Sequence, residues 1–279
     1  MKRGLLVFLT TILILFLVIC LCNADRIMRL SDRQFIGFSQ MIAEIRGARL
    51  IFIGEEHDRM IDHWRQIRII KALDDTGTPF AIGLEMFTAE NQNVLDRWVA
   101  GKIKEEDFII FYRRNWDMPW SLYRDIFLYA RRHSIPLLGL NVPREIIHKV
   151  AQEGFGALAP EERKKLPSGI TCNVDTAYME LIRRAFAEHA ENGKSFIRFC
   201  EAQMLWNKSM ARHLTEYIQL HPGDSVVVLA GTGHSMKSGI PHEALSDAGI
   251  EAKVILPVND AFSSDTMAEA DADYLIEWR

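Results

Sequence analysis

The chain has 279 residues, 48% of them hydrophobic, so one large domain can bury a sizeable core. Its formal net charge is −4, from 33 basic and 37 acidic residues. Without Lys2 and Arg3 of the N-terminal segment, 31 basic residues face 37 acidic ones, a charge of −6, which gives no reason to expect a nucleic-acid partner.

The N-terminus reads as an export signal. Lys2 and Arg3 precede an apolar stretch from Leu5 to Cys22, and the small residue Ala24 follows it. We therefore predict a signal peptide over residues 1–24 and a mature periplasmic domain over residues 25–279. The apolar stretch is also long enough to span a bilayer, so an uncleaved membrane anchor that faces the periplasm is the alternative.

Removal of that segment leaves two cysteines, Cys172 and Cys200, which are 28 positions apart. An exported protein enters an oxidising compartment, where the two could form a disulfide. Sequence separation does not fix the distance between their Cα atoms, so a pair of buried thiols is the alternative.

Helix and strand patterns alternate along the first half of the chain. Residues Ser31 to Ile45 have apolar side chains at helical spacing and predict a first helix. The apolar run from Arg49 to Ile53 predicts a strand buried on both faces, and a helix follows it from about Ile61 to Leu73. Later segments repeat this order, with strands at Phe80–Leu84 and Ile135–Leu140, helices after Thr88 and from Arg144 to Val150, and an unusually aromatic connection from Lys102 to Arg132.

The second half of the chain begins with a long segment in which no strand is evident. Residues 154–220 predict a helical insertion, with helices near Val174–His189 and Ser195–Leu220. Strands then follow at Ser225–Leu229, Ala252–Pro257 and Tyr274–Trp278, with a helix at Pro241–Ala248 and a loop over residues 260–273. This order predicts an α/β fold with a mainly parallel central sheet, flanking helices and a smaller helical insertion.

Carboxylate and imidazole side chains follow three of the predicted strands. Glu55 and His57 follow the first strand, Glu85 the second, and His234 the strand that begins at Ser225. Ligands of open α/β sheets bind at the carboxyl ends of the strands, so these four residues predict a site. They suit either a divalent metal or acid and base catalysis of hydrolysis. A third alternative is a structural remnant in which the four groups only hydrogen-bond one another.

Neighbouring residues carry weaker indications. Glu56 is interpreted as a cap of the following helix, and His63 faces either the same cleft or solvent. Gln66 and Gln203 are each compatible with a surface amide. The Gly-Thr-Gly segment at 231–233 forms either a nest of backbone amides for an anion or a tight turn with positive φ angles, and its spacing favours the turn.

Tyrosines and histidines are frequent in the aromatic connection and the helical insertion. Most are interpreted as packing residues, although a tyrosinate or an imidazole can also bind haem iron. The chain has no CxxCH motif, which excludes covalent haem attachment through that motif.

From about Arg49 to Pro257 the chain resembles the ChaN-like haem-binding uptake family, which shares a superfamily with the Tiki and TraB proteins and is similar to erythromycin esterases. The motifs that carry the resemblance are, in order, Gly-Glu-Glu-His at 54–57 with His63 and Gln66, Gly-Leu-Glu-Met-Phe at 83–87, Leu-Asn-Val-Pro-Arg at 140–144, Glu-Ala-Gln at 201–203 with Met210 and Ala211, and Ala-Gly-Thr-Gly-His at 230–234 with Gly-Ile-Pro at 239–241.

The resemblance implies an exported protein of haem or iron uptake. In such a protein, haem is held at a homodimer interface by a tyrosine, with a histidine near the propionates, and an outer-membrane haem or iron transporter is the expected partner. Tyr178 and His189 in the helical insertion are the haem residues we expect, with His63 as a further candidate. The wider superfamily implies instead a hydrolase or metalloprotease site at the strand ends, so we expect haem to bind apart from that polar edge.

Overall fold

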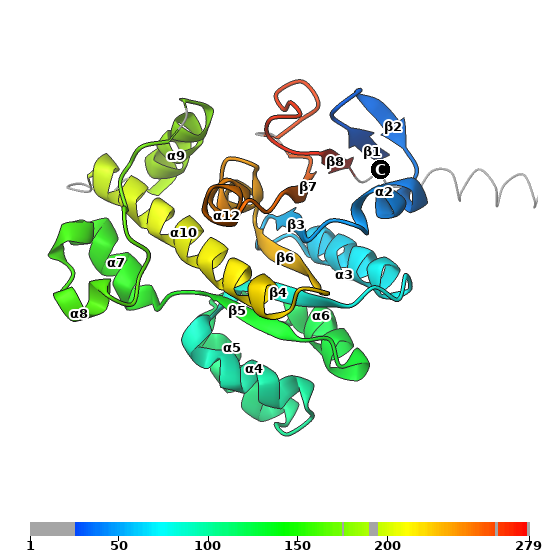
Figure 1. The fold of residues 1–279 in the computed structure, drawn as a ribbon, viewed down its shortest axis with the longest axis horizontal. Helices are drawn as coiled ribbons and strands as arrows, with labels where there is room; N and C mark the ends of the chain where they lie inside the picture. Colours follow the sequence, from blue (N-terminus) through cyan, green and yellow to red (C-terminus); the bar gives the residue numbers. More distant parts are fainter. Residues whose placement is uncertain (1–25, 175, 190–194, 260–261, 278–279) are drawn as a thin grey trace, which may run out of the picture.

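The computed structural model describes residues 26–174, 176–189, 195–259 and 262–277. Its centre is an eight-stranded sheet with the strand order β2-β1-β8-β7-β3-β6-β4-β5 (Figure 1). Neighbouring strands from β8 to β5 are parallel, whereas β1 is antiparallel to both β2 and β8. The strands are β1 (Arg26–Arg29), β2 (Gln34–Ile36), β3 (Leu50–Glu55), β4 (Phe80–Thr88), β5 (Leu137–Asn141), β6 (Ser225–Gly231), β7 (Ala252–Pro257) and β8 (Tyr274–Glu277).

Helices cover both faces of this sheet, and alternate residues of β3 point towards opposite faces. Ile51 and Ile53 pack with α3 to α6, whereas Leu50 and Phe52 pack with α10 and α12. The helices are α2 (Phe38–Ile45), α3 (Met60–Asp74), α4 (Gln92–Val99), α5 (Glu105–Asn115), α6 (Trp120–His133), α7 (Arg144–Glu153), α8 (Pro160–Arg163), α9 (Thr176–His189), α10 (Phe196–Leu220), α11 (Thr232–Ser235) and α12 (Ile240–Ala248). The predicted α/β fold with a mainly parallel sheet is therefore confirmed.

The prediction of a helix from Ser31 to Ile45 is wrong in its first half. The chain reverses at Arg33, whose φ angle is 57°, and residues 34–36 form β2 before α2 begins at Phe38. The hairpin of β1 and β2 was missed because it is held by pairing with β8 from the other end of the chain, where Met28 lies opposite Leu275. Such a long-range pairing leaves no local periodic pattern.

Several predicted boundaries also move. The strand expected to end at Leu84 continues to Thr88, so Glu85 lies inside β4 rather than after it. The strand expected from Ile135 begins at Leu137, and that expected from Ser225 continues to Gly231. The aromatic connection forms α5 and α6, whose rings pack against those of β4 and α4. That packing explains why the connection is so rich in aromatic residues.

The segment predicted as a helical insertion contributes α8, α9 and α10 and, where it is described, no strand. Figure 1 shows α9 beside the N-terminal part of α10, away from the sheet. Cys172, before α9, forms a disulfide with Cys200 of α10, with the Cα atoms 5.4 Å apart. Of the two alternatives for these cysteines, the disulfide is the one found. Among the described residues, no helix has the length and apolar character that crossing a membrane would require.

Reduction of this disulfide is expected to lower the free energy of unfolding by about 3 kcal/mol, because it releases a closed loop of 28 residues in the unfolded chain. Urea unfolding of the oxidised protein, the reduced protein and the double variant Cys172→Ser, Cys200→Ser measures the difference. Equal midpoints for the oxidised and reduced proteins would show that the bond does not stabilise the fold.

Candidate functional site

The carboxyl ends of β3, β6 and β4 lie side by side and bring the predicted site residues together. Glu55, the last residue of β3, pairs in register with Gly231 at the end of β6. Glu85 follows Leu84, which pairs with Leu229 of β6, and His234 lies on the short helix α11 directly after that strand. The expected convergence of Glu55, His57, Glu85 and His234 on one edge of the sheet is therefore found.

Glu55 lies at the centre of a buried hydrogen-bond network. Its side chain is fully buried, and its Oε1 accepts a hydrogen bond of 2.8 Å from Nδ1 of His57. The hydroxyl of Tyr123 donates to the same oxygen. Gln66 Nε2 donates to Oε2 over 2.6 Å, and His63 Nδ1 lies 3.5 Å from that oxygen. Several donors therefore compensate one buried carboxylate, as burial of a charge requires.

The network orients the ring of His57. Its Nδ1 is bound to Glu55, and the ring lines the adjoining cavity. The ring of Trp116 contacts it edge-on, with the centroids 4.9 Å apart. Behind His57, the buried His63 bonds through Nε2 to the backbone oxygen of His57, over 3.1 Å. His63 thus faces the interior behind the cleft rather than solvent, and Gln66 is buried rather than a surface amide.

The opposite charges of Glu55 and His57 stabilise both side chains in their ionised forms. Burial alone would raise the pKa of Glu55, but hydrogen bonds from His57 and His63 outweigh it and lower that pKa to about 2. Burial would lower the pKa of His57, but the hydrogen bond to Glu55 and the charge of Glu85 raise it to about 9. At neutral pH His57 is therefore an imidazolium beside a carboxylate.

These opposite shifts predict how stability depends on pH. Because the pKa of His57 is raised, its contribution is complete below about pH 6.5 and is lost as the pH rises through 9. Because the pKa of Glu55 is lowered, its contribution is complete above about pH 4.5 and is lost as the pH falls towards 2. We expect the difference in unfolding free energy between wild type and Glu55→Gln to be largest near about pH 5–6 and to shrink by about pH 9.5. A difference that grows towards alkaline pH would contradict the assignment.

Gly231 connects the two halves of the site. Its backbone N–H donates to Glu85 Oε2 over 2.7 Å, so the amide that could bind an external anion holds a carboxylate of the protein itself. The prediction of a turn with positive φ is wrong, because the φ angle of Gly231 is −53° and Gly233 is not among the glycines with positive φ. A glycine is favoured at position 231 for a steric reason instead, because a Cβ atom there would lie 3.0 Å from Cε1 of the His57 ring.

His234 is oriented by a second chain of hydrogen bonds. Its Nδ1 lies 2.7 Å from Oδ1 of Asn207, and Nδ2 of Asn207 donates to the Tyr178 hydroxyl over 2.6 Å. A carbonyl oxygen only accepts, so Nδ1 of His234 carries the hydrogen. Nε2 is then the unprotonated nitrogen of the neutral ring, and it lies 3.8 Å from Glu85 Oε1.

The two histidines are thus held in different protonation states. Burial lowers the pKa of His234 further than the charge of Glu85 raises it, and the neighbouring charge of His57 lowers it as well. His234 is neutral at a pH at which His57 is charged. One imidazolium and one neutral imidazole at one sheet edge provide an acid and a base within the same site.

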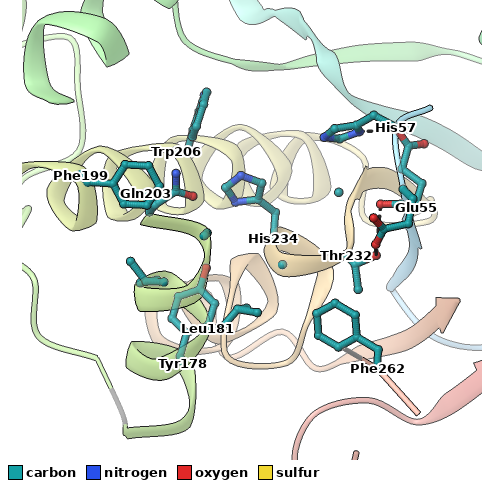
Figure 2. Close-up of a pocket in the computed structure, with 15 residues that line it drawn as sticks. Glu55, His57, Tyr178, Leu181, Phe199, Gln203, Trp206, Thr232, His234 and Phe262 are labelled. Atoms are coloured by element: carbon teal, nitrogen blue, oxygen red, sulfur yellow. Dashed lines mark hydrogen bonds and ion pairs between the residues drawn. The ribbon is translucent and has the colours of Figure 1, made fainter. Parts of the chain in front are cut away.

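A cavity of about 440 Å³ opens in front of these groups, and we call it the α9 cavity. Figure 2 shows Glu55 and His57 at one side of it, Tyr178 and Leu181 of α9 and Phe199 and Trp206 of α10 at the other, and His234 between them. The remaining lining residues are Glu56, Ile182, Ala185, Gln203, Gly231, Thr232, Gly233 and Phe262. Tyr178 therefore lines the same cavity as the acid and base groups, whereas the sequence led us to expect haem apart from them.

A second cavity of about 350 Å³, which we call the Trp116 cavity, shares His57, Trp206 and His234 with the first. Glu85 also lines it. Its outer part contains Arg144, which forms an ion pair of 2.5 Å with Asp117. The histidines thus stand between two openings, one largely apolar and one that contains an arginine.

The divalent-metal prediction is not supported. Among the residues that the structure describes, no group of three or more His, Cys, Asp or Glu side chains is arranged to hold a metal ion. The physical reason is that the oxygens of Glu55 accept hydrogen bonds from three side chains and have His63 Nδ1 3.5 Å away, and Glu85 Oε2 accepts from Gly231. The predicted ligands bind partners within the protein instead of facing a common centre.

Two further interpretations are settled by contacts. Glu56 does not cap α3: its Oε1 accepts from Asn259 over 2.7 Å and from Thr232 over 3.4 Å. Gln203 lines the α9 cavity. His189 ends α9, and its side chain lies outside the described part of the chain.

Sequence reasoning missed two residues that organise the site, Tyr123 and Asn207. Tyr123 belongs to the aromatic connection and was interpreted as packing, although its hydroxyl donates to Glu55. Asn207 is fully buried on α10, with Ala211 and Leu214 on the same face at helical spacing. A polar residue on an otherwise apolar helical face was the available signal.

Comparisons with known proteins agree with this fold. A family model described as haem-binding uptake, Tiki superfamily, ChaN, matches residues 41–243. No curated protein sequence matches the chain. The solved structure of ChaN from Campylobacter jejuni with cofacially bound haem is 21% identical, with a TM-score of 0.74. The match covers 92% of this chain and 97% of the ChaN chain.

Two further solved structures match with lower TM-scores. An erythromycin esterase mutant in its open conformation is 14% identical with a TM-score of 0.49, and the match covers 84% of this chain and 76% of the esterase. A type III effector is 12% identical with a TM-score of 0.48, and the match covers 85% of this chain and 90% of the effector. The family model spans well over half of the chain and the fold is that of ChaN; the chain therefore belongs to the ChaN family of haem-binding uptake proteins in the Tiki superfamily.

Proposed function

We propose that this protein is an exported haem-binding protein of bacterial haem or iron uptake, and that haem binds in the α9 cavity. The observation that carries the location is Tyr178, a tyrosine of the helical insertion that lines this cavity. Its oxygen accepts a hydrogen bond of 2.6 Å from Asn207. Such a donor stabilises a phenolate, the form in which tyrosine binds haem iron.

The walls of the cavity fit a large, mostly apolar ligand with polar groups at one side. Leu181, Ile182 and Phe262 supply apolar surface, and Trp206 supplies an aromatic face. The volume of about 440 Å³ lies in the range of small-molecule sites. His57 provides a positive charge at the edge that an acidic group of the ligand could meet.

The cellular setting is part of the same proposal. The N-terminal segment that resembles a signal peptide supports export to the periplasm, either as a free protein or on an uncleaved anchor. The disulfide between Cys172 and Cys200 supports an oxidising compartment. By the family resemblance we propose a homodimer that exchanges haem with an outer-membrane transporter.

Titration of haemin into the mature protein tests the proposal. We expect a saturable shift of the Soret band, and we expect Tyr178→Phe to weaken the affinity at least about tenfold, because it removes only the oxygen that binds iron. Tyr129→Phe is the matched control, since the Tyr129 hydroxyl bonds to Asp74 on another helix. The absence of a saturable shift would refute haem binding, and an unchanged affinity in Tyr178→Phe would refute Tyr178 as the residue that binds iron.

We propose ester or amide hydrolysis as the second candidate function. It is favoured by one specific observation, that an imidazolium and a neutral imidazole, each beside a carboxylate, face the same cavity. Glu85 Oε1 and His234 Nε2 are separated by 3.8 Å, a distance that a single water molecule can bridge by hydrogen bonds. The pair would act as the general base.

In this mechanism the water loses a proton to the Glu85 and His234 pair and attacks the carbonyl carbon of the substrate. The new C–O bond forms as the bond to the leaving oxygen or nitrogen breaks. His57 donates its Nε2 proton to the leaving group, and the products are a carboxylic acid and an alcohol or amine. The charge of His57 is maintained by Glu55, which therefore acts as a positioning residue.

A panel of p-nitrophenyl esters and small amides tests hydrolysis directly. Release of p-nitrophenol by wild type, at a rate that Glu85→Gln reduces, would support it. A rate equal to that of buffer for every substrate would refute it.

A further inference from the structure

We propose that the hydrolytic site selects esters or amides with an extended apolar acyl group, and that this group occupies the α9 cavity. The inference rests on the second candidate function and adds the class of substrate. It starts from the arrangement of the cavity: His57 lies at one side, His234 lies in the middle, and the α9 and α10 side chains lie at the other side (Figure 2).

The far side of the cavity has the character of an acyl-chain site. Leu181, Ile182 and Ala185 follow one another on the inner face of α9, and Phe199 and Trp206 face them from α10. Leu181 also reaches across to Gly233, where a Cβ atom would lie 3.5 Å from its Cδ2. Apolar walls on two helices favour burial of methylene groups in proportion to the area removed from water.

The charges around the cavity exclude an anionic acyl group. The described lining residues include the carboxylates Glu55 and Glu56 but no lysine or arginine. An anion placed beyond His57 would be buried without a partner, which is strongly unfavourable. Arg144, by contrast, lines the Trp116 cavity, so polar or charged groups are better matched on that side of the histidines.

Ala185 offers a direct way to change the size of the site. It is a half-buried residue of the cavity wall, and a phenyl ring in its place would project into the space that a long acyl chain needs. Ala187, two positions further along α9, is exposed and does not line the cavity. The same substitution at Ala187 therefore controls for the effect of phenylalanine on the helix.

The experiment compares p-nitrophenyl acetate, butyrate, octanoate and dodecanoate, which share one leaving group. We expect kcat/KM of wild type to be at least about tenfold higher for octanoate than for acetate, because more apolar surface is buried in the transition state. We expect Ala185→Phe to lower the ratio of octanoate to acetate at least about tenfold, whereas Ala187→Phe keeps the wild-type ratio. A flat chain-length profile, or equal ratios in both variants, would overturn the proposal and leave hydrolysis itself standing.

Binding of cis-parinaric acid, a fluorescent long-chain carboxylic acid, separates the acyl site from the catalysis. Saturable binding by wild type and Ala187→Phe that Ala185→Phe weakens at least about tenfold would support the acyl site even if no ester is hydrolysed, and only the hydrolase proposal would then fail. Absence of saturable binding together with absence of hydrolysis would overturn both.

Discussion

Glu55→Ala is expected to lower the free energy of unfolding by about 3–5 kcal/mol at neutral pH. The carboxylate is fully buried, and its removal leaves the half-buried imidazolium of His57 without its counterion. It also leaves the Tyr123 hydroxyl and the Gln66 amide without the acceptor to which they donate. Unsatisfied buried donors and an unpaired charge are among the most destabilising changes that one substitution can make.

Urea unfolding at pH 7 measures this loss, and two variants define its origin. Glu55→Gln keeps the shape and one acceptor oxygen but removes the charge, so we expect an intermediate loss. Glu105→Ala removes a half-buried carboxylate that is paired with the exposed Arg124, and we expect a loss of no more than about 1 kcal/mol. A loss below 1 kcal/mol in Glu55→Ala would mean that the network is not what stabilises this edge of the sheet.

Glu85→Gln and His234→Ala are each expected to reduce kcat/KM for ester hydrolysis by about 10²–10⁴-fold, the usual contribution of general acid and base groups. Glu85→Gln retains the shape of the side chain but loses the proton acceptor that faces His234. His234→Ala removes the unprotonated Nε2 that Asn207 holds in place. The two losses should not add fully in the double variant, because both groups act on the same proton.

The pH profile provides a second check on these roles. Activity that needs a neutral His234 and a charged His57 should fall as the pH rises through about 9, where His57 loses its proton. His221→Ala is the control, because His221 is exposed at the end of α10. Equal loss in His221→Ala, or activity that persists undiminished above pH 10, would contradict the assignment of acid and base.

The parts of this molecule that could be predicted from sequence are those that local patterns encode. The buried strands β3 and β6 are continuous apolar runs, and Glu55 and His234 were found because each follows such a run directly. Parallel strands bring their carboxyl ends to one edge, so the convergence of these residues needed no knowledge of the detailed packing.

The parts that could not be predicted depend on contacts between distant segments. Tyr123 donates to a carboxylate 68 positions away, and the side chain of Asn207 reaches His234 from a different helix. The hairpin of β1 and β2 depends on β8, which is more than 200 residues further along the chain. The place of Tyr178 in the helical insertion predicts it as a haem residue, yet only the packing of α9 against α10 brings it to the cavity that the histidines line.

The most direct test of haem binding in the α9 cavity is diffraction at the iron absorption edge from crystals of the haemin complex. We predict an anomalous peak for iron within reach of the Tyr178 oxygen, between α9 and the edge of the sheet that carries His57 and His234. An iron peak elsewhere on the molecule, away from this cavity, would contradict the proposal.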